Sequence, residues 1–314
     1  MLTSLRLTWR LQRWEIAFLI GASLVLAAVA AFAAWQLPVA TRNLLDCAAR
    51  FPNGPMPTEC ESPYDWLGYL SGAATIVQGA TTVVPVIVGI LLGAPLVSRE
   101  IEKRTAPIAW SLARSRRWWL AGRMLPLALA IAVVLLLLGQ ATEASILAVP
   151  DAHLNFRYFA MHGPLVAARG LAIFAIGAFV GLWMGRMLPA ILVTGVLAFV
   201  MIAGLQVARA PIMRAEAVWT VPDEQGAGDF ETIYGSGYID DATGAFVSDQ
   251  EAYERFPEEF ETGSGELPGL TKVYLILPAE RYPVFVAREM AAVVVIGLIA
   301  AAGALLLVRS RRPE

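Results

Sequence analysis

Long apolar stretches separated by short charged segments dominate the pattern of this chain. A helix needs about 20 apolar residues to cross about 30 Å of hydrocarbon. Because unpaired strand edges cannot be satisfied in lipid, each such stretch is predicted as a spanning helix. Six stretches have the required length: 15–37, 73–97, 124–149, 165–185, 188–207 and 284–308. The pattern therefore predicts an all-α membrane protein with six transmembrane helices.

Composition supports this class. Of the 314 residues, 57% are hydrophobic and 16% are charged, whereas a soluble globular protein is about 45–50% apolar and about 25% charged. The net charge of −2 gives no global basic field for nucleic acid. His153 and His162 are too few and too scattered for a metal or relay cluster. The apolar excess therefore indicates surface that faces lipid.

Motifs of catalytic and nucleotide-binding sites do not occur in the sequence. There is no G-x-x-x-x-G-K-[ST] loop, no H-E-x-x-H, no G-x-S-x-G turn and no Cys-His ligand spacing. We therefore expect no catalytic residue, metal or cofactor on this chain. An intramembrane enzyme has no motif in its favour.

The first apolar stretch is interpreted as a retained anchor and not as a signal peptide. Its basic lead-in is long, its apolar run fills a bilayer and no A-x-A cleavage site follows. In residues 2–14, Arg6, Arg10 and Arg13 share one helical face, which suits an interfacial helix that reaches lipid headgroups. An ordinary basic flank is the alternative.

Arginine and lysine residues set the expected orientation. With both termini in the cytoplasm, 14 of the 24 Lys and Arg residues fall on the inner side, in short segments. This positive-inside bias predicts a multi-pass protein of the bacterial inner membrane. Cys47 and Cys60 then share the first outer loop, where a disulfide is favoured over a metal site. Two unpaired thiols are the alternative.

A soluble insert interrupts the membrane segments near the C-terminus. We expect a transmembrane part over 1–208, an acidic extracytoplasmic insert over 209–283, and a sixth span with a basic tail over 284–314. The insert has 15 carboxylates against five cations. Residues 234–247 resemble strand, turn and strand, and Ser248 begins a helix, so a small α+β cap is predicted. Its acidity indicates a solvated face or attraction of cations.

Charged residues inside the bilayer are costly and often functional. Glu143 and Arg169 lie at similar depths from the outer ends of the third and fourth spans, and Gln140 lies one turn from Glu143. An ion pair between Glu143 and Arg169 that locks the two helices is therefore predicted. A substrate-contacting role is the alternative.

The largest inner loop, 98–123, contains a predicted short helix. Thr105 is a suitable N-cap and Pro107 suits a first helical turn. The helix should run over 106–113, and Ser115 should cap the next helix. The apolar positions of the short helix are Ile108, Ala109, Trp110 and Leu112.

This loop resembles the type-2 ABC exporter permeases, especially actinobacterial ones. The resemblance begins at Gly93-x-Pro95-Leu96-Val97-x-Arg99-Glu100-Ile101-Glu102 and continues through Thr105, Ile108-Ala109-Trp110-Ser111 and Ser115-Arg116. The order of spans, inner loop and outer insert is similar over the full length. One departure is Arg104, where the family usually has Gly before the Thr.

The resemblance implies a permease subunit that works with a separate cytoplasmic ABC ATPase, which would hold ATP and Mg²⁺. It implies a homodimer, or a pair with a related permease, whose second and fifth spans line an export pathway. Gly79, Pro85 and Gly89 would allow bending and close packing in the second span. The residues implied to couple to the ATPase are Arg99, Glu100, Glu102, Thr105, Ile108, Trp110 and Leu112.

Other interpretations of the loop and of the chain stay open. The loop could be a basic segment that binds anionic membrane lipid. The chain could be a membrane-anchored sensor or assembly scaffold that presents the acidic insert. The sequence gives no indication of the transported substrate.

Overall fold

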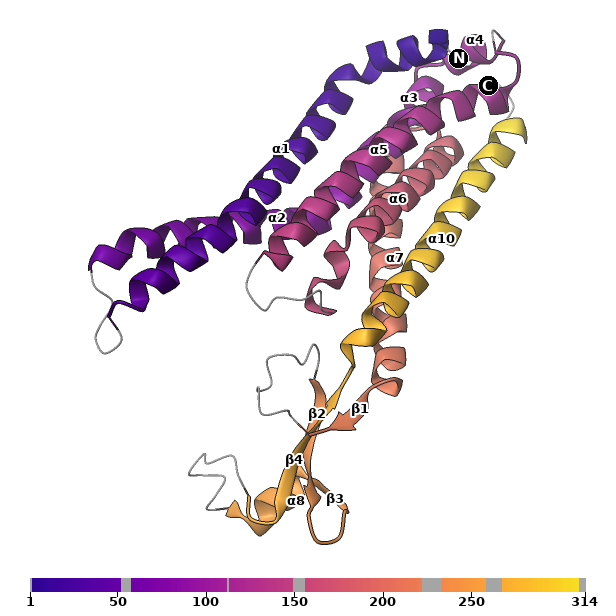
Figure 1. Cartoon of the computed structure of the whole chain (residues 1–314). Coiled ribbons are helices and arrows are strands. Elements are labelled where there is room, and N and C mark those ends of the chain that lie inside the picture. Colours follow the sequence, from indigo (N-terminus) through magenta and orange to yellow (C-terminus); the bar gives the residue numbers. More distant parts are fainter. Residues whose placement is uncertain are drawn as a thin grey trace. The chain divides into compact units, whose positions relative to one another are not determined.

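The computed structural model describes residues 2–51, 58–111, 113–148, 156–221, 233–257 and 267–310. The chain is mostly helical and includes one small antiparallel sheet (Figure 1). It divides into two compact units. The first comprises Met1–Leu154, Tyr158–Ile202 and Val286–Glu314, and the second comprises Asn155–Arg157 and Ala203–Phe285.

Six helices in the described part of the chain are long and apolar enough to cross a membrane, which confirms the six predicted spans. Most extend beyond the predicted ends because their polar flanks continue the helix. Helix α1 runs without a break from the lead-in into the first span, and the side chains of Arg6, Arg10 and Arg13 lie outside the described residues. The spanning helices are α1 (Leu2–Ala48), α2 (Glu61–Gly93), α5 (Arg116–Leu147), α6 (Gly163–Met184), α7 (Met187–Ala215) and α10 (Tyr282–Ser310).

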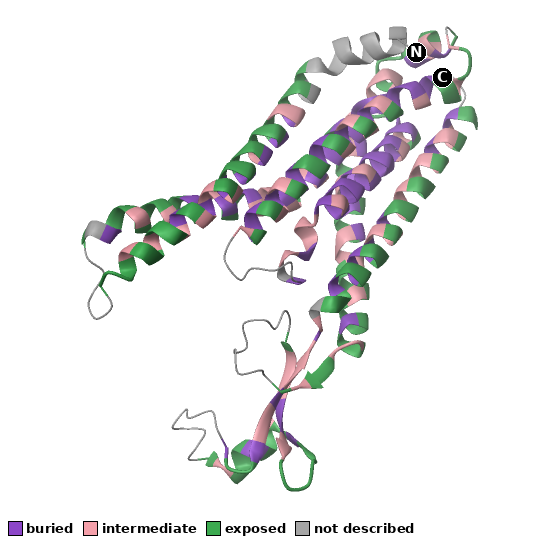
Figure 2. Cartoon of the chain, viewed as in Figure 1, coloured by how far each residue is buried: buried purple, intermediate pink, exposed green. Residues whose placement is uncertain are grey.

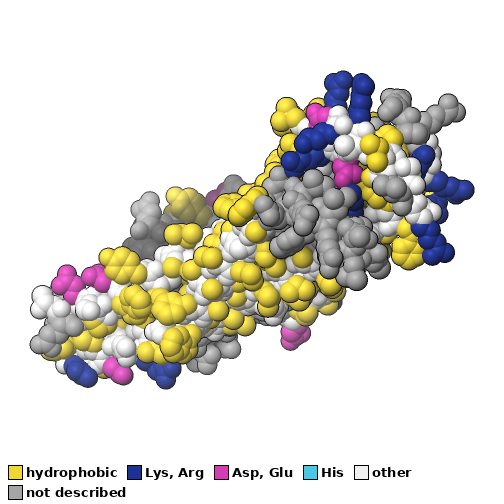
Figure 3. Space-filling view, turned by 90° about the horizontal axis from the view of Figure 1, so that it is seen from above, with side chains coloured by type: hydrophobic (Ala, Val, Ile, Leu, Met, Phe, Trp, Pro, Cys, Tyr) yellow, Lys and Arg dark blue, Asp and Glu magenta, His cyan; other side chains and the backbone are white. Residues whose placement is uncertain are grey.

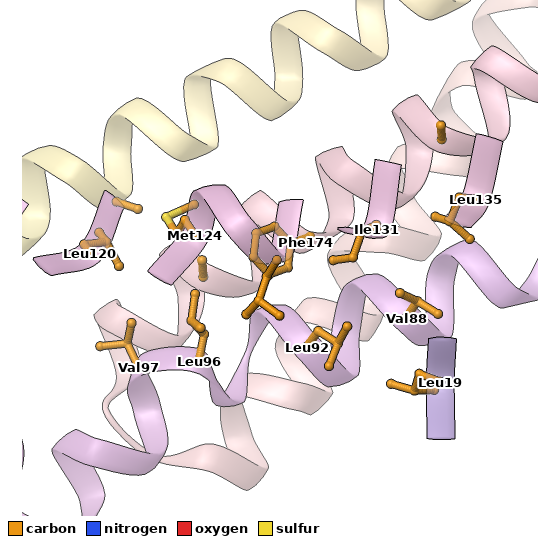
Figure 4. Packing of buried hydrophobic residues seen from close by; sticks show 14 of the residues in the cluster. Leu19, Val88, Leu92, Leu96, Val97, Leu120, Met124, Ile131, Leu135 and Phe174 are labelled. Atoms are coloured by element: carbon orange, nitrogen blue, oxygen red, sulfur yellow. The ribbon is translucent and has the colours of Figure 1, made fainter. Parts of the chain in front are cut away.

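Helix α6 forms the centre of the first unit. In its most apolar stretch, 83% of the residues are buried, against 22% in α7 and 17% in α10. Figure 2 shows the buried positions along α6. Its Phe174 points between α2 and α5, as Figure 4 shows. The apolar side chains around it are Val88, Leu92, Leu96 and Val97 from one side and Leu120, Met124, Ile131 and Leu135 from α5.

Glycines bring the backbones of α2 and α6 into direct contact. A Cβ added at Gly93 would lie 2.5 Å from the carbonyl oxygen of Phe174, and one added at Gly177 would lie 2.8 Å from the amide nitrogen of Ala94. A Cβ at Gly181 would collide with the Ala94 carbonyl oxygen. Small residues allow this close approach of helices. Helix α2 ends at this contact, and Pro95 is the first residue of the next helix.

At their other ends, α1 and α2 form a hairpin closed by covalent and apolar contacts. The structure joins Cys47 to Cys60 in a disulfide with a Cα separation of 5.8 Å, the pairing expected from the sequence. Cys60 ends a short 3-10 helix, Thr58–Cys60, directly before α2. Further along the hairpin, Leu37 of α1 packs in one buried cluster with Leu70 of α2.

The second unit contains a four-stranded antiparallel sheet in the order β1-β4-β2-β3. The predicted strand, turn and strand are β2 and β3, and Ser248 caps α8 by accepting a hydrogen bond from the Glu251 amide (3.2 Å). The predicted α+β character of the insert is confirmed; β1 and β4 were not predicted. The elements are β1 (Val218–Thr220), β2 (Ile233–Asp240), β3 (Phe246–Ser248), α8 (Asp249–Arg255) and β4 (Leu270–Ile276).

Candidate functional site

Two short helices follow α2 and form the candidate site, here named the α3–α4 segment. It comprises α3 (Pro95–Glu102), a turn over 103–105, and α4 (Ala106–Ser111). In the turn, Arg104 has a φ of 55°, a left-handed conformation that favours glycine. This is the position at which the resembled permeases usually have Gly. The turn therefore has the left-handed conformation that suits glycine, and Arg104 is strained in it.

Helix α4 begins at Ala106, as predicted, but it is shorter than expected. It ends at Ser111, Ala113 is not helical and Leu112 lies outside the described residues. Thr105 directly precedes α4, as predicted for an N-cap, and its carbonyl accepts from the Ala109 amide (3.1 Å), while its hydroxyl donates to the Glu100 carbonyl (3.3 Å). The Thr105 amide donates to the same carbonyl (3.0 Å), so this residue closes the turn between α3 and α4.

The two large apolar side chains of α4 face opposite ways. Trp110 is 8% exposed and meets the Trp119 ring of α5 edge to face, with centroids 6.0 Å apart. The Arg116 guanidinium lies 5.0 Å from the Trp110 ring centre, a cation–π distance. Ile108, in contrast, is 65% exposed. Trp110 therefore anchors α4 to α5, and Ile108 is available to a partner.

An ion pair between a buried arginine and a partly buried glutamate joins α3 to α5. Glu100 of α3 pairs with Arg123 of α5, whose residue exposure is only 4%. The Arg123 guanidinium also lies 4.3 Å from the centre of the Trp119 ring. Ser115 begins α5 as predicted, since its hydroxyl accepts from the Trp118 amide (3.2 Å). Glu100 thus forms an ion pair within the chain.

The second carboxylate of the motif, Glu102, contacts a different helix. Its Oε2 accepts a hydrogen bond from the backbone amide of Met187 (2.9 Å), the first residue of α7. The first amides of a helix have no partner within the helix, and they carry partial positive charge. Glu102 therefore caps α7 from outside, while its side chain stays exposed to solvent.

Cations surround the exposed side of the α3–α4 segment. Figure 3 shows Lys and Arg side chains gathered at the end of the molecule that carries these helices. Arg99 is half-buried. The exposed members of this basic surface are Lys103, Arg104, Arg114 and Arg117.

The predicted ion pair between Glu143 and Arg169 is wrong. Arg169 of α6 pairs with Glu289 of α10, and it donates to the carbonyl oxygen of Ala160 (3.3 Å). Both charged side chains are buried. The reason is the path of the sixth span, which places Glu289 beside α6. No role for Glu289 was predicted from the sequence. Its position five residues inside the predicted sixth span could have indicated one, because a carboxylate within a span usually has a partner.

Glu143 has a structural role at the start of α6. Its Oε2 accepts from the amide of Gly163 (3.2 Å), the first residue of that helix, and from Gln140 Nε2 (3.4 Å). Its Oε1 lies 3.4 Å from His162 Nδ1. Glu143 thus caps α6 as Glu102 caps α7. The described residues contain no group of three or more His, Cys, Asp and Glu side chains that could hold a metal ion.

These features define a class: a multi-pass helical membrane protein in which a short two-helix segment is fixed to three spanning helices. Residues 20–209 match the model of the ABC-2 membrane transporter related family, so the chain belongs to that family. It is accordingly a permease component of an ABC transporter, a type that normally pairs with an ABC ATPase. No curated protein matches the chain.

Proposed function

We propose that this chain is the membrane-spanning subunit of an ATP-driven exporter, in which the α3–α4 segment couples the permease to a separate ATPase. The ATPase holds ATP and Mg²⁺, and this chain supplies the path through the membrane. Family membership supports the permease part of the proposal. The coupling role is supported by the geometry of the α3–α4 segment, and the export direction by the resemblance of the loop motif alone.

The observation that carries the proposal is the two-sided character of α4. Its Trp110 is anchored on α5, while Ile108 is presented outward beside exposed cations. Such a rigid, rooted helix can pass a displacement from a nucleotide-driven partner to the spanning helices as a rigid-body movement. Ile108 would enter an apolar groove of the ATPase, and Lys103 and Arg117 would lie at the rim of the interface.

The export pathway would lie between two copies of this chain, or between this chain and a related permease, in the bacterial inner membrane with both termini inside. The exposed sides of α2 and α7 would line it. On α2, a Cβ added at Gly72 or Gly79 meets nothing within 4 Å, and Gly204 of α7 is equally open. Gly89, by contrast, packs on Ile173 of α6, so the open glycines of α2 leave one side of that helix for a partner or substrate.

Affinity purification in mild detergent, followed by mass spectrometry, tests the proposal. Wild-type chain should retain an ATPase with a G-x-x-x-x-G-K-[ST] loop. An Ile108→Asp variant should lose it, because a carboxylate buried in an apolar groove is costly. Ile108→Val, which keeps the apolar contact, is the matched control and should retain the ATPase.

Two results would contradict the proposal. If wild type retained no ATPase even after cross-linking, the exporter function would fail and the scaffold interpretation would lead. If Ile108→Asp retained as much ATPase as Ile108→Val, the docking role of α4 would be wrong, although the permease assignment would stand.

A further inference from the structure

We infer that Glu102 is a positioning residue that ties the α3–α4 segment to α7, and that it does not contact the ATPase. This inference rests on the proposed function and gives the motif's second carboxylate a different role from the one its sequence position implied. It concerns how a displacement of the segment reaches the fifth span, which has little other packing in the chain.

The first step is the position of α3 between three spanning helices. Its buried start, Pro95–Ser98, follows the glycine contact with α6, and Glu100 pairs with Arg123 of α5. Helices α5 and α6 are therefore attached to α3 through buried contacts. Any movement of α3 must carry these two helices along, since packed interiors do not deform continuously.

The second step is the contrast with α7. In helix α7, only 22% of the most apolar stretch is buried. The buried side chains of α7 in the first unit are Ala190, Thr194, Ala198 and Met201. Gly185, with a φ of 66°, ends α6 two residues before α7 begins. Glu102 is the α3 residue that reaches across this short turn to the Met187 amide. This hydrogen bond thus links the segment to a weakly enclosed helix.

The third step is the size of the effect. A carboxylate at a helix start, exposed to solvent, contributes a modest stabilisation, so its loss leaves the fold intact. Modest free energies are nevertheless the scale of allosteric coupling, for which factors of about 5 to 150 are typical. Removing the tie should therefore reduce the response of α7 by about 3- to 10-fold while ATPase binding is kept.

Distance measurements between spin labels in lipid nanodiscs can test the tie. Labels at Leu125→Cys on α5 and Leu188→Cys on α7 measure the distance between these two helices, and both positions are well exposed (60% and 67%). A second pair, Leu125→Cys with Trp183→Cys on α6, serves as the reference (64% exposed at Trp183). The native cysteines are joined in the disulfide and do not take up label.

The variants are Glu102→Ala, Glu102→Gln and, as a control outside the α3–α4 segment, Asp46→Ala, which removes an exposed carboxylate of α1. Glu102→Ala should broaden the α5–α7 distance distribution in the chain alone and should reduce its ATP-dependent change in the complex. The α5–α6 distances should not change. Glu102→Gln keeps an acceptor oxygen and should restore most of the wild-type behaviour, and Asp46→Ala should match wild type.

Each alternative outcome is decisive. If Glu102→Ala loses the ATPase that wild type retains, Glu102 is a docking residue and the inference is overturned. An unchanged α5–α7 distribution in Glu102→Ala overturns it as well. If wild type retains no ATPase, the proposed function fails, and the distribution in the chain alone still decides whether the tie exists.

Discussion

The backbone contact between α6 and the end of α2 gives the sharpest test of the packing. A Cβ added at Gly177 would lie 2.8 Å from Ala94 N and 3.0 Å from Gly93 C. The first distance is about 0.7 Å inside the optimum of about 3.5 Å for non-bonded atoms. Both neighbours are backbone atoms, so no side-chain rotation relieves the overlap. Gly177→Ala must therefore separate α6 from the joint between α2 and α3.

The magnitude follows from a matched comparison. Gly21 of α1 is the control position, because a Cβ added there meets nothing within 4 Å. Gly177→Ala and Gly21→Ala make the same chemical change in a spanning helix, so the helix-propensity gain of about 1 kcal/mol cancels between them. The remaining difference is the cost of overpacking, about 1–3 kcal/mol. Gly177→Ala should be the less stable by that amount.

Unfolding in mixed detergent micelles, followed by circular dichroism as the fraction of dodecyl sulfate rises, measures the difference. Adding Gly181→Ala to Gly177→Ala should cost less than the sum of the two single changes, because both open the same joint. If Gly177→Ala proved as stable as Gly21→Ala, the close contact of the two backbones would be refuted.

Three further predictions concern other parts of the chain. Arg169→Ala should lower the free energy of unfolding by about 3–5 kcal/mol, because it removes the arginine partner of the buried Glu289 carboxylate; if adding Glu289→Ala recovered none of that loss, the ion pair would be excluded. Arg104→Gly should stabilise the chain by about 1 kcal/mol in thermal unfolding, since it removes a left-handed non-glycine residue, and a lower melting temperature would contradict the strain. The backbone amides of Thr243 and Ala242 lower the pKa of Asp240 from 3.8. Its stabilisation of the turn is thus present above pH 3.8 and lost as the pH falls through the lower folded pKa; the Thr243 amide resonance should shift in that window, and a shift that persisted in Asp240→Asn would refute the assignment.

Local patterns explain which features were predictable from the sequence. Hydropathy and length fix a spanning helix without reference to its neighbours, so the six spans were predicted well. The Ser248 cap and the β2–β3 hairpin depend on a few adjacent residues, and these were predicted as well. Strand β4 was missed because its partners β1 and β2 lie far from it in the sequence.

Features that depend on neighbouring helices were not predictable in the same way. The partner of Arg169 is set by which helix lies beside α6, and similar depth alone pointed to Glu143 instead of Glu289. Helix α4 is too short for its periodicity to reveal that Trp110 faces inward. Glu100 and Glu102, two residues apart, point to α5 and α7, and a sequence motif cannot separate these internal contacts from contacts with a partner.

Site-specific photo-cross-linking in the native host tests the central claim most directly. A benzophenone amino acid would replace Ile108, the exposed apolar residue of α4, and in a second strain Phe51, which follows α1 and is also exposed (41%). The account predicts that an ABC ATPase is cross-linked from position 108 and not from position 51. An ATPase absent from position 108, or captured equally from both positions, would contradict a permease that docks its ATPase through the α3–α4 segment.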